Sequence, residues 1–260
     1  MKRIVLFMVC IFLLPAIFAE ASTKEKNVQL VQAAERGNLT DVQNALNSGA
    51  DVNAKDDRGL TALMMASYGG YTNGSYAEIV KLLLDKGANV NIKTHEGITA
   101  LSKASSGGNA EVMKLLLAKG ADINVKNSKG ETALMAASSG GNAEVVKFLL
   151  AKGVDVNAKD DRGFTALIMA SNGEYTYVNY AEIVKLLLDK GANVNIKTDE
   201  GITALMIASS RGYAEIVKLL LDKGADINVK NSKGKTALMI AKDKGKTEIV
   251  GMLERAGAKE

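Results

Sequence analysis

The chain has 260 residues, with 33 basic and 29 acidic side chains and a formal net charge of +4, and this near balance does not indicate a nucleic-acid-binding protein. It has one histidine, His95, and one cysteine, Cys10, so it has almost no material for catalysis by a histidine-activated nucleophile or by a thiol. The sequence shows no zinc-type Cys and His cluster, no calcium loop and no glycine-rich phosphate cradle, so we expect no metal and no cofactor.

The first 21 residues have the layout of a secretory signal peptide. Lys2 and Arg3 precede an uncharged, largely apolar run over residues 4–19, and the segment ends in Ala19-Glu20-Ala21. The run is shorter than the roughly 20 apolar residues of a membrane-spanning helix. We expect cleavage after Ala21, and an uncleaved membrane anchor is the alternative.

A chain cleaved after Ala21 is expected in the periplasm or outside a bacterial cell. It would contain no cysteine, because Cys10 lies in the signal, and it would rely on its apolar core rather than on disulfides. No later segment approaches membrane-spanning length, so we expect no membrane span after cleavage.

From residue 61 onward the chain is an array of similar units. The tripeptide Thr-Ala-Leu begins at residues 61, 99, 132, 165, 203 and 236, at intervals of 33 or 38 residues. The first five copies are followed by a block of the type Glu-Ile-Val-Lys-Leu-Leu-Leu. A period of this length predicts supersecondary units that bury their apolar faces on one another.

A longer period is also present. Residues 77–94 recur without change as residues 181–198, which is an offset of 104 residues. Three units were therefore duplicated as a block, and a functional feature of the first three should recur in the second three.

The unit over residues 127–160 predicts a hairpin turn followed by two helices. Gly130 supplies the positive φ of a tight turn, and Thr132 can cap the first helix by accepting a hydrogen bond from a free backbone amide. Gly140-Gly141-Asn142 predicts the corner between the helices. The second helix has a broad apolar face over residues 145–150, and Gly153 predicts its left-handed end.

These residues resemble the ankyrin repeat. The resemblance covers about residues 30–258 and includes Asp160-Asp161-Arg162-Gly163-Phe164-Thr165 and Lys223-Gly224-Ala225-Asp226-Ile227-Asn228 at the family's spacing. It implies an all-α solenoid of about seven stacked helix-turn-helix units with hairpin loops. The family's proline is alanine in the six clear units, and its histidine is Met64, Ser102, Met135, Ile168, Met206 and Met239. We therefore expect the usual histidine-centred loop bonding to be absent and the fold to survive.

The signal layout and the resemblance together predict a signal peptide, residues 1–21, and one ankyrin-repeat domain, residues 22–260. The expected repeats cover about residues 27–55, 56–93, 94–126, 127–159, 160–197, 198–230 and 231–260. The first and last are the most polar, as capping repeats of a solenoid must be.

The hairpin tips are the first candidate binding site. The position before each threonine is apolar in four of six units, at Leu60, Ile98, Phe164 and Ile202. An exposed apolar stripe could anchor a protein partner, with Arg58, Glu96, Arg162 and Glu200 in a charged rim. The alternative is that these side chains only pack along a ladder of hairpins.

The second candidate site is a pair of loops that lengthen two of the repeats by five residues each. The loops hold six of the seven tyrosines, at Tyr68, Tyr71 and Tyr76 and at Tyr175, Tyr177 and Tyr180. Tyrosine combined with Gly, Asn, Ser and Thr is typical of binding loops. The alternative is that the rings fold back over the corner and leave their hydroxyls in water.

The sequence therefore predicts a non-enzymatic, monomeric protein-binding module exported to the cell envelope. The partner would be another protein, held by the hairpin tips, the first helices and the tyrosine loops. One alternative is a carbohydrate or cell-wall binder that stacks sugars on the tyrosines. The other is an enzyme with a carboxylate site, although the pairs Asp56-Asp57 and Asp160-Asp161 are ordinary turn residues, as is His95.

Overall fold

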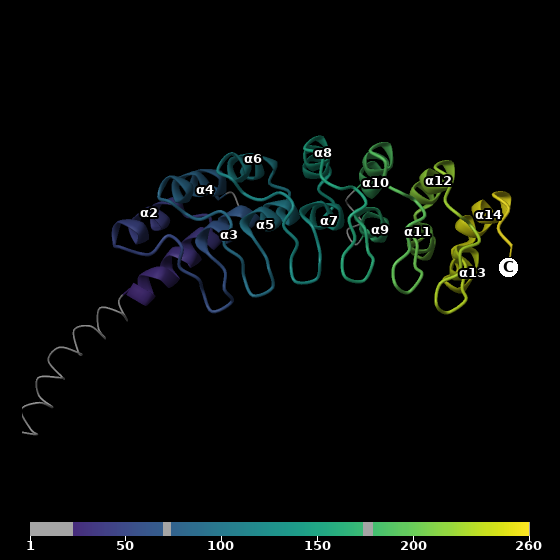
Figure 1. The fold of residues 1–260 in the computed structure, drawn as a ribbon, viewed down its shortest axis with the longest axis horizontal. Helices are drawn as coiled ribbons and strands as arrows, with labels where there is room; N and C mark the ends of the chain where they lie inside the picture. Colours follow the sequence, from purple (N-terminus) through teal and green to yellow (C-terminus); the bar gives the residue numbers. More distant parts are fainter. Residues whose placement is uncertain (1–22, 70–73, 174–178, 260) are drawn as a thin grey trace, which may run out of the picture. The chain divides into compact units, whose positions relative to one another are not determined.

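The structure is a computed structural model that describes residues 23–69, 74–173 and 179–259 (Figure 1). Within these ranges the chain consists of helices and loops, and its isolated β-bridge joins Lys55 to Thr61. The predicted all-α class is confirmed. No helix in the same ranges is both long enough and apolar enough to cross a membrane.

The chain divides into two compact units. The first holds the described residues up to His95 together with Thr99–Ala104 and Glu111–Ala121, and the second holds Glu96–Ile98, Ser105–Ala110 and the described residues from Asp122 onward. The helices of the first unit are that over residues 23–35, α2 (Leu39–Asn47), α3 (Ala62–Tyr68), α4 (Tyr76–Asp85) and most of α6 (Ala110–Ala118). Helix α5 (Ala100–Gly107) begins in the first unit and ends in the second.

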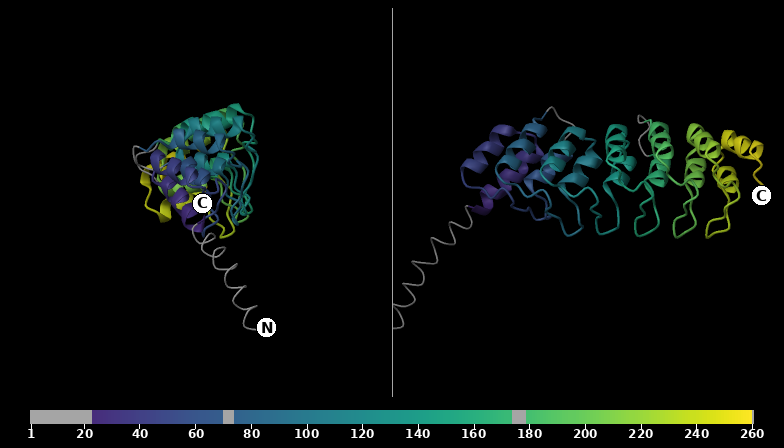
Figure 2. Two further views of the ribbon diagram at one scale, coloured as in Figure 1. Left: turned by 90° about the vertical axis from the view of Figure 1, so that its left-hand side faces the viewer. Right: turned by 45° about the horizontal axis from the view of Figure 1, so that its top comes forward.

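The second unit is two layers of helices with loops along one side (Figure 2). Its helices are α7 (Ala133–Ser139), α8 (Ala143–Ala151), α9 (Ala166–Asn172), α10 (Tyr180–Asp189), α11 (Ala204–Arg211), α12 (Ala214–Asp222), α13 (Ala237–Asp243) and α14 (Thr247–Arg255). The odd-numbered helices pack on one another in chain order, and so do the even-numbered ones. We call these the first helices and the second helices. The hairpin loops extend from the side of the first helices (Figure 1).

Threonine side chains begin the first helices, as the sequence predicts. The Oγ1 atoms of Thr132, Thr165 and Thr203 each accept a hydrogen bond from the backbone amide three residues later, at 3.3 Å. This bond satisfies one of the amides that the first helical turn leaves without a partner. Each first helix is therefore fixed at its start by its own sequence.

Two glycines of the same repeat confirm the predicted turns. Gly153 follows the end of α8 with φ 75°, which is the left-handed conformation that glycine adopts at helix ends. Gly130 has φ 76°, and a Cβ atom there would lie 2.6 Å from Asp161 Oδ1 of the next hairpin. Gly130 therefore permits both the turn and the close approach of its neighbour.

Two of the threonine amides find side-chain partners at the position where the family has histidine. The amide of Thr99 donates to Ser102 Oγ at 2.9 Å, and Ser102 Oγ donates to the carbonyl of Thr99. The amide of Thr132 donates to Met135 Sδ at 3.4 Å. In place of the histidine-centred bonding of the family, serine and methionine offer acceptors at this position.

Asparagine side chains join successive repeats at the loops that follow the second helices. Asn157 Oδ1 accepts from the amide of Asn193 at 2.7 Å, and Asn157 Nδ2 donates to the carbonyl of Gly191 at 3.2 Å. Asn195 makes the equivalent pair of bonds to Asp226 and Gly224, at 2.8 and 3.2 Å. Each asparagine bridges two repeats through backbone groups, so the bridge does not depend on the side chains of the next repeat.

Candidate functional site

The hairpins of the second unit are joined into a continuous ladder. The amide of Asp161 donates to the carbonyl of Lys129, and the amide of Asp199 donates to that of Arg162, at 2.9 and 3.0 Å. The amide of Ser232 donates to the carbonyl of Glu200 at 2.8 Å, and the amide of Ser128 to that of Glu96 at 2.8 Å. One backbone hydrogen bond therefore connects each tip to the next and holds the row in place.

Each hairpin is also closed from within. In the hairpin over residues 160–164, the amide of Asp160 donates to the carbonyl of Phe164 at 2.9 Å. The Oδ1 atom of Asp160 accepts from the amides of Arg162 and Phe164, at 2.9 and 2.7 Å. The backbone of the tip is thus ordered before any partner arrives.

The four apolar residues of the predicted stripe are placed differently. Leu60 is buried, with 8% of its surface exposed. Ile98, Phe164 and Ile202 are half-buried, so each packs on the ladder with one side and presents the other to solvent. Leu60 therefore fits the alternative that these side chains only pack along the ladder of hairpins. The other three side chains are partly exposed, so a partner could cover them.

The two arginines of the predicted rim have different partners although their hairpins differ by one residue, Leu60 against Phe164. Arg58 Nε donates to Asp56 Oδ2 at 2.9 Å, and Arg58 Nη2 lies 3.8 Å from Glu35 Oε1. Arg162 Nη2 lies 3.9 Å from Asp160 Oδ2, and its guanidinium carbon lies 4.9 Å from the centre of the Phe164 ring. The first arginine is held by carboxylates and the second by an aromatic ring.

Glu96 and Glu200 complete the predicted rim. Both side chains are exposed, and both residues take part in the ladder through their backbone carbonyls. Their carboxylates therefore add negative charge to the rim without closing the hairpins.

Tyr76 and Tyr180, which end the two long loops, fold back onto the helices. Tyr76 and Tyr180 are 9% and 5% exposed. Their hydroxyls donate to the backbone carbonyls of Glu35 and Ser139, at 3.2 and 3.0 Å. The two rings cover the corner between the helices of their repeats, as the alternative prediction expects. Their hydroxyls, however, donate to the preceding repeat and not to water as that alternative proposed.

The remaining tyrosines differ from this pair. Tyr68 is 38% exposed, with Lys103 Nζ lying 5.4 Å from the centre of its ring. Tyr71, Tyr175 and Tyr177 lie outside the described residues. Tyr213 is not among the predicted site residues, yet its hydroxyl donates to the carbonyl of Gly173. Tyr76 and Tyr180 begin α4 and α10, and Tyr213 directly precedes α12. This shared position is the sequence signal that could have indicated the role of Tyr213.

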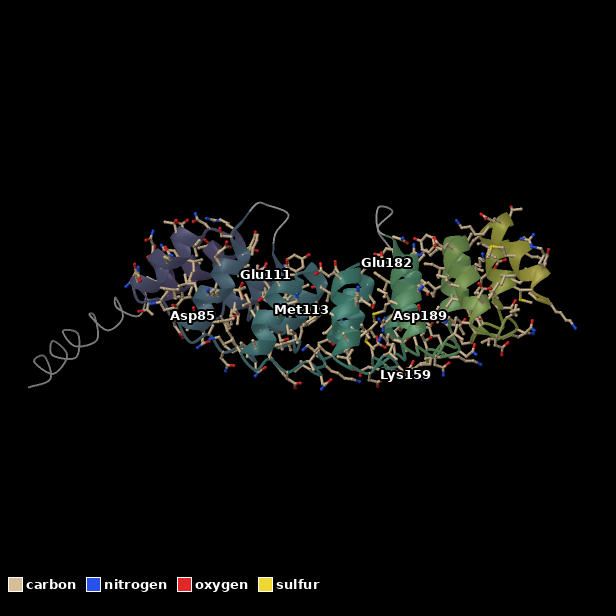
Figure 3. All side chains as sticks on the ribbon, turned by 90° about the horizontal axis from the view of Figure 1, so that it is seen from above. Asp85, Glu111, Met113, Lys159, Glu182 and Asp189 are labelled. Atoms are coloured by element: carbon tan, nitrogen blue, oxygen red, sulfur yellow. The ribbon has the colours of Figure 1, made fainter. Side chains whose placement is uncertain are left out.

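Exposed charges on the second helices form an ion-pair bridge between neighbouring repeats. Asp189 lies on α10 (Figure 3). Its carboxylate accepts hydrogen bonds from Lys185 and Lys223, at 2.8 and 3.1 Å. The hydrogen bond from Lys185, followed by that from Lys223, holds the pKa of the Asp189 carboxyl below its ordinary value. The same bond to Asp189, followed by its charge, raises the pKa of Lys185. All three side chains are largely exposed, so the bridge ties neighbouring helices weakly.

A pocket opens between the loops that follow α6 and α8. Its lining includes Leu134 of α7, Ile123, Asn124 and Lys126 from one loop, and Val154, Asp155, Asn157, Ala158 and Lys159 from the other. In the described part of the chain, no three His, Cys, Asp or Glu side chains are grouped so that they could hold a metal ion. The pocket is a crevice between two successive repeats.

The fold and the ladder of hairpins define a helical-repeat protein whose candidate site is a surface rather than a cleft. The family model for ankyrin repeats, which describes three copies, matches residues 30–127, 117–197 and 175–259. The chain belongs to the ankyrin-repeat family. A comparison with curated proteins gave no match.

Proposed function

We propose that the chain is an exported protein-binding module whose partner docks on the hairpin tips and first helices of the second unit. Ankyrin repeats are generally protein-protein interaction modules, and this supports the class of function. The ladder of hairpins carries the more specific proposal. Its tips are fixed by backbone hydrogen bonds and present half-buried Phe164 and Ile202, so little ordering entropy opposes association.

The first helices extend the same apolar surface. Met169, Ile207 and Ile240 occupy one position in α9, α11 and α13, and all three are half-buried. Half-buried apolar side chains in a row, with a rim of mixed charge, are typical of the core and border of a protein interface. The tyrosine loops contribute less to the proposed surface, because Tyr76 and Tyr180 are committed to the corners of their own repeats.

Export is a separate part of the proposal and rests on the signal-like layout of residues 1–21. Cell fractionation with mass spectrometry of the isolated protein tests it. A chain in the periplasm or medium that begins at Ser22 supports export with cleavage. An intact chain in the cytoplasm would refute this part and leave the binding surface unaffected.

Binding is tested by capturing proteins on the immobilised chain and on two double variants. Phe164→Ala with Ile202→Ala removes the tip anchors, and Lys147→Ala with Lys218→Ala changes exposed residues of the second helices. We expect a protein that binds the wild type and the second-helix variant to be lost from the tip variant, with both variants folded by circular dichroism. Equal capture by all three would show that the tips are not the binding surface.

A further inference from the structure

The duplication supplies two copies of one hairpin, and the structure shows that they are not equivalent. Residues 52–63 and 156–167 are identical except for Leu60 and Phe164. Asp56, Asp57 and Arg58 of the first copy correspond to Asp160, Asp161 and Arg162 of the second. A difference in how the two arginines are bonded must therefore come from that single position or from the neighbouring repeat.

The neighbouring repeat supplies one difference. Glu35, which lies 3.8 Å from Arg58, ends the first helix of the preceding repeat. The residue 104 positions later is Ser139, at the end of α7. The two residues also occupy equivalent places in the structure. Tyr76 donates to the carbonyl of Glu35, and the equivalent Tyr180 donates to the carbonyl of Ser139. Arg162 therefore lacks the second carboxylate that holds Arg58.

The aromatic ring supplies the other difference. Stacking on Phe164, at 4.9 Å, leaves Arg162 Nη2 3.9 Å from Asp160 Oδ2, whereas Arg58 Nη2 lies 2.9 Å from Asp56 Oδ2. The Asp160 side chain is 1% exposed, and its Oδ2 has no hydrogen-bond partner among the described residues. The Arg162 side chain is 69% exposed. Its N–H donors lie in the guanidinium plane, so stacking on the ring face does not use them.

We propose that Arg162 and Phe164 form a recognition site for one Asp or Glu side chain of a protein partner, with an apolar partner residue beside it on Phe164. This inference rests on the proposed function and names the chemistry of the partner. Stacking orients the guanidinium before binding, and its planar fork matches a carboxylate with two parallel hydrogen bonds. The buried Asp160 carboxylate attracts Arg162 to the hairpin tip. At 3.9 Å from Arg162 Nη2, it is too far away to accept a hydrogen bond from the guanidinium.

The surrounding charges limit the partner to a single acid. Asp161, Asp199 and Glu200 are exposed on the same and the next hairpin. A run of acidic residues would meet these like charges, whereas one carboxylate followed by an apolar side chain would not. At the corresponding site Arg58 is more fully paired, because its Nε donates to Asp56, its Nη2 lies 3.8 Å from Glu35 Oε1, and the neighbouring Leu60 is buried.

A matched pair of substitutions at Ser139 tests the site without changing Arg162 or Phe164. Ser139 is exposed and contributes its backbone carbonyl to Tyr180, so its side chain can be changed. Ser139→Glu places in the second copy the carboxylate that Glu35 provides in the first, and Ser139→Gln has the same shape without the charge. The probe is a phage-displayed library of random peptides, selected on the purified protein and then measured on the variants by biolayer interferometry.

We expect the selected peptides to carry Asp or Glu next to an aliphatic or aromatic residue. Arg162→Lys and Ser139→Glu should each weaken their binding about fivefold or more, because lysine lacks the fork and the new glutamate competes for it. Ser139→Gln and Arg58→Lys should leave binding unchanged. Circular dichroism confirms that each variant is folded.

Four results would overturn the inference. Selected peptides without an acidic residue, or equal binding to the Ser139→Glu and Ser139→Gln variants, would show that the surface does not use Arg162 for a carboxylate. An equal loss with Arg58→Lys would show that charge acts on the whole molecule rather than at this tip. Failure to select any peptide would also refute it. The proposed function is decided separately, by whether the tip variant loses a protein that the wild type captures.

Discussion

A serine occupies the same buried position in the first helices α7, α9 and α11, and its hydrogen bonding changes from one repeat to the next. Ser138, Ser171 and Ser209 are each 0% exposed. Ser171 Oγ donates to the carbonyl of Leu167 at 2.8 Å, whereas the Oγ atoms of Ser138 and Ser209 have no hydrogen-bond partner among the described residues. Burying a hydroxyl without a hydrogen-bond partner is unfavourable, so Ser138 and Ser209 lower the stability of the folded chain.

Replacing Ser138 by alanine should therefore stabilise the chain. We expect Ser138→Ala to raise the free energy of unfolding by about 1 kcal/mol, since it removes an unpaired hydroxyl and improves helix propensity. Ser171→Ala is the control and should change it by less than about 0.5 kcal/mol, because the lost bond to Leu167 only repeats a helical one. Urea denaturation followed by circular dichroism measures both. A destabilised Ser138→Ala variant would show that the hydroxyl is satisfied.

Neighbouring second helices are connected by exposed charges whose pairing can be followed by titration. The Asp189 carboxyl has a lowered pKa, so its bridge stabilises the fold above the ordinary carboxyl pKa and loses this effect as pH falls through the lowered value. Lys185 has a raised pKa, so its contribution is present below the ordinary lysine pKa and is lost as pH rises through the raised value. The bridge therefore acts over the whole range between these two titrations.

Carbon-detected NMR titration of Asp189 tests this arrangement. The Lys185→Met variant should raise the Asp189 pKa more than the Lys223→Met variant does, because the bond from Lys185 is the larger cause and the shorter contact. High salt should raise the pKa in the wild type, since the groups are exposed and screened. If both variants and salt leave the pKa unchanged, the three side chains do not form a bridge in solution.

Local features of the helices and hairpins could be predicted from the sequence, and contacts between repeats could not. Thr132 and Gly153 act within a few residues of themselves, so their roles follow from local backbone chemistry. Arg58 and Arg162 occupy nearly identical hairpins, and their different partners depend on Glu35 and Ser139 of another repeat. The bonds of the Tyr76 and Tyr180 hydroxyls also reach a backbone 41 residues away. Sequence periodicity reveals the repeats but not which donor meets which acceptor.

In the second unit as a whole, cohesion depends on what each repeat contributes to the next. Asn157 and Asn195 each make two bonds across a repeat boundary. Asn124 occupies the equivalent place one repeat before Asn157, and within the described chain its side chain makes no such bridge. The pocket lined by Asn124 and Asp155 opens at this same step. Coupling between repeats is therefore uneven along the unit.

Removing one bridge should loosen one boundary. We expect Asn157→Ala to lower the free energy of unfolding by about 1 to 2 kcal/mol, because two hydrogen bonds between repeats are lost. Hydrogen exchange should accelerate at the amide of Asn193, which donates to Asn157. Asn193→Ala is the matched control, since the Asn193 side chain accepts from its own loop, at the amide of Asn195, and its loss should cost less. Equal effects of the two variants would show that the bridge between repeats adds nothing to local turn bonding.

The 104-residue offset gives the array a means of changing its length. Unequal recombination between the coding segments for residues 77–94 and 181–198 would excise three repeats and rejoin identical sequence, so no junction would be new to the protein. In the shortened chain, the residues that follow the junction would be those of the second copy, in the same register as before. The Phe164 hairpin would be lost and the Leu60 hairpin kept. A single genetic event could therefore remove the proposed Arg162 site while keeping the first and last repeats of this sequence.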